Sequence, residues 1–332
     1  MSRRQWFSLR YMLTIRLDVE DLASVRFAYS PMQEAAFSLP AWIPGHRAAV
    51  YRPWLSATAI GLDDVDWPLL LALRGQRGWL PDFLTPWPRT ARPDLQTELD
   101  DIRATPDELV LHDLHGSHGD ELPAPIVELS TRPGELAARI ADAFAGYWRA
   151  VMASRWLRMT AILEADITYR SHRIATGGAA ALFKDLDPRI RWEGGLVLFD
   201  ESRLDADVEV SGRGLPLMPS IFPSGVTAVI DPGQPPILTY PARGRGTLTI
   251  EPDAAPEGLA ALLGRTRAAL LAGLEEPAST SHLAELYRLT PGAVSQHLGV
   301  LAANGLLTRS RSGHRVLYWR TALADRLVDG AR

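Results

Sequence analysis

The fold is decided by residues 279–319, which read STSHLAELYRLTPGAVSQHLGVLAANGLLTRSRSGHRVLYW. Hydroxyl side chains open this stretch and leucines follow at a helical spacing, so we expect a first helix to begin near Ser281. A turn over residues 288–290 ends it. Thr290 can cap a second helix, and Pro291 suits its first position because no backbone N–H is needed there. The stretch therefore predicts two short helices joined by a tight turn.

The second helix has two unlike faces. A buried stripe is predicted at i, i+4 and i+7, formed by Val294, Leu298 and Leu301. The opposite face carries small or hydrogen-bonding residues, namely Gly292, Ser295, Gln296 and Gly299, with His297 at its edge. Such a face allows close approach to a DNA major groove, where a glutamine can pair with adenine. We interpret it as a base-reading surface.

After the second helix the chain alternates as a two-stranded hairpin does. Asn304 and Gly305 should end the helix, since both tolerate left-handed backbone. We expect strands over 306–309 and 314–319 about a turn at 311–313. Basic side chains gather near that turn: Arg309, Arg311, His314 and Arg315. The hairpin is thus positioned to meet phosphates, and Thr290 adds a further contact to the DNA backbone.

An alternative interpretation is a helical pair that merely packs, with the arginines as a solvated face. It requires the cap, the turn, the small-residue face and the basic hairpin to coincide without a common cause. The combination favours DNA binding.

Residues 289–307, LTPGAVSQHLGVLAANGLL, closely resemble the recognition-helix pattern of the ArsR family of bacterial transcription regulators, and the likeness covers 256–329. The preceding part resembles the large domain found ahead of this head in a group of actinobacterial ArsR-like regulators. The stretches that carry this second likeness are GWLPDFLTP, LEADITYR, GGAAALFKDL and LGRTRAALLA. The resemblance implies a winged helix-turn-helix and a homodimer on a pseudo-palindromic operator in double-stranded DNA. It also implies repression as the usual outcome.

Charge is distributed unevenly along the chain. Residues 258–332 carry nine arginines against five acidic residues, a net charge of +4, whereas the whole chain has a net charge of −4. The remaining residues therefore carry −8. A basic C-terminal part joined to an acidic remainder is typical of a DNA-binding protein with a separate regulatory domain. Positive charge is needed only on the face that meets the DNA phosphates.

Metal sensing is not expected. The chain has no cysteine, which excludes thiolate ligands and thiol catalysis. ArsR-type metal sensors usually carry paired cysteines where this chain has residues 279–281, STS, or Asp and His on a last helix, where residues 322–328 include Asp325 but no histidine. The resemblance therefore implies no metal, and we predict no cofactor.

One cluster of residues could still bind a metal ion. It consists of His112, His115 and His118, with Asp113, Asp120 and Glu121. Gly116 and Gly119 predict a loop in its second half, so the three rings would not be held together. We interpret the cluster as a solvated loop, with a metal site as the alternative.

The whole chain predicts an α+β fold in three parts. These are a mainly helical regulatory domain at 1–187, a β-rich segment packed with it at 188–251, and a winged helix-turn-helix at 252–332. Turn-separated apolar runs between 189 and 250, the last at 247–250, indicate an antiparallel sheet. Residues 252–258 would be a linker and 259–274 a single helix. No apolar run reaches membrane-span length, and none follows Arg3-Arg4, so we expect a cytoplasmic protein.

Eight of the ten tryptophans lie in the N-terminal region: Trp42, Trp54, Trp67, Trp79, Trp87, Trp148, Trp156 and Trp192. They can be plain core, or they can line a pocket for a small apolar effector. We see no triad or other catalytic set, so the chain is predicted not to be an enzyme.

The sequence thus predicts a sequence-specific, DNA-binding, homodimeric repressor whose N-terminal domain senses an effector or mediates dimerisation. The alternative is an N-terminal enzyme or protein-interaction module whose winged helix contacts proteins.

Overall fold

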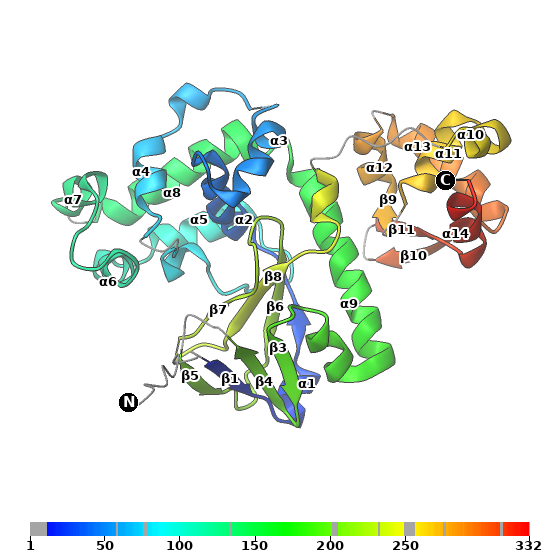
Figure 1. The fold of residues 1–332 in the computed structure, drawn as a ribbon. Helices are drawn as coiled ribbons and strands as arrows, with labels where there is room; N and C mark the ends of the chain where they lie inside the picture. The colour runs from blue at the N-terminus through cyan, green and yellow to red at the C-terminus, as the bar shows by residue number, and fades with distance from the viewer. Residues whose placement is uncertain are drawn as a thin grey trace, which may run out of the picture.

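The computed structural model describes most of the chain: residues 12–57, 59–75, 79–132, 134–200, 205–231, 233–248, 256–274, 277–287, 289–312 and 315–331. Helices and sheets share these residues, so the predicted α+β class is confirmed. Figure 1 shows a larger body, residues 12–248, and a smaller C-terminal head, residues 256–331. Within the described residues, none of the helices combines the length and the apolar composition needed to cross a membrane.

The helices of the body pack around one large hydrophobic cluster, in which Leu69, Ile140, Phe144 and Tyr147 are almost completely buried. Its elements are α2 (Pro31–Ser38), η1 (Leu39–Trp42), η2 (Arg47–Tyr51), α3 (Arg52–Ser56), η3 (Leu62–Asp64), α4 (Trp67–Ala72), η5 (Asp82–Leu84), α5 (Leu95–Arg103), α6 (Asp107–His118), α7 (Ala124–Ser130), α8 (Leu136–Tyr147) and the π-helical turn η6 (Trp148–Met152). Helix α1 (Val19–Ala23) packs instead against the cluster beneath the sheets, through its partly buried Leu22. Local caps explain several starts, because the side chains of Ser30, Asp66 and Asp94 each accept a backbone N–H of the following first turn.

The prediction of a loop in the second half of the histidine cluster is wrong. Helix α6 continues through Gly116 to His118, and Gly119 ends it with a positive φ of 81°. The reason is tertiary, because Ser117 and His118 are buried and the backbone of Gly75 packs closely against Ser117. The His118 ring lies 2.9 Å from the Ser117 hydroxyl, so this histidine belongs to the core.

The tryptophans beside the helical cluster pack as tilted and edge-on ring pairs. Trp42 lies 4.8 Å from Trp67, and Trp67 lies 5.7 Å from Tyr147, measured between ring centroids. Trp148 and Trp156 are 5.1 Å apart in an edge-on arrangement. These rings pack against the helical cluster, and the effector pocket stays a prediction.

Two four-stranded sheets form the other part of the body, in the orders β3-β4-β1-β5 and β2-β6-β8-β7. The strands are β1 (Met12–Arg16), β2 (Arg26–Phe27), β3 (Ile190–Glu193), β4 (Leu196–Asp200), β5 (Ala206–Glu209), β6 (Pro216–Ser220), β7 (Thr227–Val229) and β8 (Ile237–Pro241).

The prediction of one antiparallel sheet over 189–250 is wrong in two respects. The N-terminal strand β1 lies between β4 and β5, and β2 pairs with β6, so both sheets draw on the chain's beginning. The pairs β1–β5, β2–β6 and β6–β8 are parallel. In addition, the strand expected at 247–250 begins as the 3₁₀ turn η7 (Arg245–Leu248), and 249–250 lie outside the described residues. Turn signals reveal neighbours along the chain, whereas parallel partners come from distant segments.

Helix α9 (Trp156–Lys184) joins the two parts of the body. Met159 and Leu163 in its first half belong to the helical cluster, and Leu182 and Phe183 at its end belong to the cluster beneath the sheets. The helix is kinked near its end, where Gly178 has a φ of 66°.

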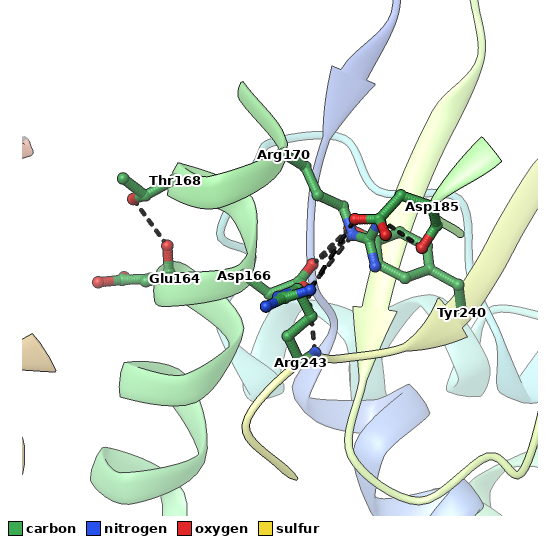
Figure 2. Close-up of polar contacts among 7 residues, drawn as sticks. All are labelled: Glu164, Asp166, Thr168, Arg170, Asp185, Tyr240 and Arg243. Carbon is green, nitrogen blue, oxygen red and sulfur yellow. Dashed lines mark hydrogen bonds and ion pairs between the residues drawn. The ribbon is translucent and has the colours of Figure 1, made fainter. Parts of the chain in front are cut away.

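A buried ion pair within α9 meets the end of β8, and hydrogen bonds from that end hold the helix to the sheet (Figure 2). Arg170 Nε donates to an Asp166 carboxylate oxygen at 3.0 Å, and these side chains are 3% and 0% exposed. The Tyr240 hydroxyl and the Arg243 backbone N–H also donate to Asp166, at 2.8 and 2.9 Å. Arg170 further donates to the Asp185 carbonyl at 3.1 Å. Burial raises the pKa of Asp166, although Arg170 and the hydrogen bonds oppose this effect.

The head has a hydrophobic cluster of its own, drawn from described residues between Leu259 and Ala331. Its elements are α10 (Glu257–Leu263), α11 (Arg265–Ala272), β9 (Ala278–Ser279), α12 (Thr280–Leu286), α13 (Pro291–Ala303), β10 (Leu307–Ser312), β11 (Arg315–Arg320) and α14 (Ala322–Asp329). The single helix predicted over 259–274 is wrong, because Gly264, with a φ of 81°, separates α10 from α11. Most of the predicted linker, 252–255, lies outside the described residues.

The Asp166→Ala substitution should destabilise the protein by about 3–5 kcal/mol, because it leaves the buried Arg170 guanidinium with only the longer ion pair to Asp185, at 3.7 Å. The free energy of unfolding in urea measures this loss. Asp207→Ala is the matched control, since Asp207 pairs with Arg16 on the surface, with side chains 56% and 47% exposed. The control should cost less than about 1 kcal/mol. Equal losses in the two variants would contradict a structural role for the buried pair.

Candidate nucleic-acid interface

Helix α13 begins where the sequence predicts. The Thr290 hydroxyl oxygen accepts the backbone N–H of Ala293 at 3.2 Å, and Pro291 occupies the first helical position. Gly305 follows the helix with a φ of 70°, so one of the two residues expected to be left-handed has that conformation. Asn304 instead has a φ of −95°, and its side chain donates to the Val300 carbonyl.

The two predicted faces of α13 are confirmed as a packing pattern. Val294, Leu298 and Leu301 are at most 1% exposed and join the core of the head. The residues on the opposite face are exposed: Gly292, Ser295, Gln296 and Gly299. His297 is half-buried at the edge of this face. A solvent-facing surface of small and amide side chains is thus available near the start of the helix, and its role in DNA binding stays a prediction.

The hairpin is longer than predicted. Strands β10 and β11 pair in antiparallel register from Leu307↔Arg320 to Ser312↔Arg315, so Arg311 and Ser312 lie in a strand and not in the turn. Arg309 and Arg311 are exposed and, two residues apart, lie on the same face of the hairpin. His314 lies outside the described residues, as does the side chain of Arg315.

A third strand was missed by the sequence analysis. Residues Ala278 and Ser279 form β9, which pairs with β11 through Tyr318↔Ala278 and Leu317↔Ser279. Ser279 also caps α12, because its hydroxyl oxygen accepts the backbone N–H of His282 at 3.2 Å. The capping hydroxyl was visible in the sequence, but a two-residue strand carries no periodic signal. The sheet order β10-β11-β9 ties the hairpin to the start of α12.

Arg320 holds the base of the hairpin and is a further residue that the sequence analysis did not single out. Its Nε lies 2.8 Å from an Asp325 carboxylate oxygen on α14, and its NH1 donates to the Ala272 carbonyl at the end of α11. This arginine is turned into the head and is 14% exposed, so it positions the hairpin rather than facing solvent.

The predicted histidine cluster is not assembled as a metal site. His112 and His115 are exposed, His115 bonds to the Gly119 carbonyl, and His118 is buried. Among the described residues, no group of three or more histidines and carboxylates is placed to hold a metal ion.

No family model, curated protein or solved structure matches this chain. The resemblance to ArsR regulators therefore rests on the sequence alone and stays an expectation.

Thr290→Ala should lower the free energy of unfolding by about 1 kcal/mol, because it removes the acceptor of the Ala293 N–H at the start of α13. Urea unfolding followed by circular dichroism measures the change. Ser310→Ala, at an exposed position of β10, serves as the control and should stay within about 0.5 kcal/mol of the parent. If Thr290→Ala left the free energy of unfolding unchanged, the Thr290 cap would not stabilise the start of α13.

Proposed function

We propose that this chain is a sequence-specific DNA-binding transcriptional regulator of the ArsR type, acting as a homodimeric repressor. The observation that carries the proposal is the exposed face of α13, where Gly292, Ser295 and Gln296 lie at the start of a helix whose other face is fully packed. A helix so placed can enter the major groove with its N-terminal residues against base edges.

The hairpin supplies the second part of the interface. Arg309 and Arg311 extend from β10 on one face, where guanidinium groups can bind phosphate oxygens of the duplex backbone. Phosphate contacts position the protein, whereas the contacts of α13 select the sequence. The net charge of +4 over residues 258–332 favours this approach.

An apolar groove supports the dimer. It lies between α10 and α14, has a volume of about 270 Å³, and is lined by Gly258, Leu259, Leu262, Arg326, Leu327, Gly330 and Ala331. Leu262 is 68% exposed, which is unfavourable for a large aliphatic side chain in water. We propose that a second copy of the chain covers this groove, so that two heads read two half-sites about one helical turn apart.

The alternative is that the head contacts another protein instead of DNA. Protein interfaces are enriched in aromatic and other large anchors, whereas the exposed α13 face carries glycine, serine and glutamine. This composition favours DNA.

Fluorescence anisotropy tests the function directly. The purified protein is titrated against its own upstream intergenic DNA and against scrambled DNA over a salt series. We expect a preference of ~10³-fold or more and a steep fall of affinity with salt. If binding is equal and weak, selection from random DNA follows; failure to enrich any sequence would overturn the proposal in favour of a protein-binding head.

Two substitutions separate base reading from phosphate binding. Gln296→Ala should cost roughly 1–3 kcal/mol on the preferred site and relax the preference at one base pair. Arg311→Ala should weaken binding to all sequences about equally and reduce the salt slope by about one. Anisotropy with matched and single-mismatch duplexes measures both effects, and parent-like binding by both variants would show that the interface lies elsewhere.

Leu262→Glu should disrupt the proposed dimer, because it places a carboxylate in the apolar groove. We expect at least about a 10-fold rise in the dimer dissociation constant, measured by sedimentation velocity. Leu109→Glu is the control, since Leu109 is also exposed, at 55%, but lies on α6 of the body. A dimer that tolerates the Leu262 change as well as the control change would rule out this groove as the interface.

A further inference from the structure

The head touches the body through helix α9. Both α12 and β9 contact this helix, and Figure 1 shows the head beside its upper half. The contact is separate from the proposed DNA interface, because it involves the first helix of the pair and not the exposed face of α13.

One face of α9 reveals where the head sits. Ala161 and Ala165 are one turn apart and point away from Met159 and Leu163, which face the body core. They are nevertheless only 3% and 7% exposed. Farther along the same face of α9, His172 and Thr176 are exposed. Only the first half of this face is therefore covered by another part of the chain. Among the described residues, α12 and β9 are elements of the head that lie against α9, and we assign the burial of the two alanines to them.

The head side of the contact is formed by β9 and α12. Strand β9 consists of Ala278 and Ser279, and α12 carries His282; these three residues are 7%, 5% and 7% exposed. The described members of the hydrophobic clusters fall either in the body or in the head, and no cluster bridges the two. Interfaces of this kind between units of one chain permit relative motion, because little apolar area is lost when they open.

His282 is the chemically unusual member of this contact. Its ring is buried, and the Nδ1 atom has no hydrogen-bond partner among the described residues. Arg158, which lies on α9 one turn before Ala161, is the described charged group that acts on the ring, and β9 contributes the uncharged Ala278 and Ser279. A protonated imidazole would therefore be a buried cation facing a guanidinium.

We propose that Arg158, Ala161 and Ala165 of α9 form a releasable clasp with Ala278, Ser279 and His282 of the head, and that protonation of His282 opens it. The head then moves as a unit relative to the body.

The direction of the pH effect follows from the His282 environment. Burial, and then the charge of Arg158, lower the pKa of His282 from 6.5 to about 4 in the closed form. In the open form the ring is solvated and regains its ordinary pKa. The stability of the closed form relative to the open form is therefore greatest above pH 6.5. It decreases as the pH falls from 6.5 towards 4, because in this range only the open form takes up the proton.

Electron–electron distance measurements between two spin labels test the clasp in the full-length protein. The chain has no native cysteine, so labels attach only at introduced sites. Ala175→Cys on α9 and Ala303→Cys on α13 are both exposed and lie outside the clasp. Labelled chains are diluted with unlabelled chains, so that distances within one chain dominate. We expect one narrow distance distribution at pH 8. At pH 5 we expect a broader one, with the ratio of open to closed chains raised by at least about 10-fold.

Three variants make the test specific to His282. His282→Gln stays neutral and should keep the closed distribution at pH 5, whereas His282→Arg should open the clasp already at pH 8. His172→Gln, on the exposed part of α9, should respond to pH as the parent does. Circular dichroism at both pH values separates opening from unfolding.

An unchanged distribution in the parent at pH 5, or opening of His282→Gln to the same extent as the parent, would overturn the proposal. The readout contains no DNA, so this failure is distinguishable from a failure of the proposed DNA binding.

Discussion

The ion pair between Asp166 and Arg170 is the constraint on which the body depends. It lies in the middle of α9, where the helix leaves the helical cluster and begins to cover the sheets. Tyr240 and the Arg243 backbone bind the same carboxylate from the end of β8. Two buried charges are tolerated there because each is matched in geometry and hydrogen bonds. The two bonds from β8 and the residues after it to Asp166 therefore fix the rotation and height of α9 on the sheet, and with them the face that the helix turns to the head.

The two ends of this arrangement differ in physical character. Toward the body, α9 presents large apolar residues and a satisfied ion pair, which resist separation. Toward the head its buried face includes Ala161 and Ala165, and Arg158 lies near His282. Opening the second contact exposes far less apolar surface than opening the first, and the free energy of burial scales with that area. Any motion within the chain is therefore expected at the head and not within the body.

The sequence predicted the head well because its signals are local. A cap at Thr290, a proline after it and a stripe of three apolar residues lie within one helix, and each is present as expected. The body was predicted less well. The partners of β1 lie about 185 residues away in the chain, as in the Leu13↔Phe199 pair, and no local pattern identifies them. Helix α6 likewise continues past Gly116, because burial of His118 outweighs the low helix propensity of glycine.

The same distinction holds for the two candidate sites. The α13 face was found from sequence, since exposure and side-chain type follow from helical spacing alone. The clasp was not found from the sequence. His282 and Arg158 lie more than a hundred residues apart in the chain, and they come together only through the packing of α12 on α9. In the closed form Ser295 and Gln296 remain exposed. Release of the clasp would therefore not uncover the proposed base-reading surface. Its effect on the proposed DNA binding would come from where the acidic body lies relative to the duplex.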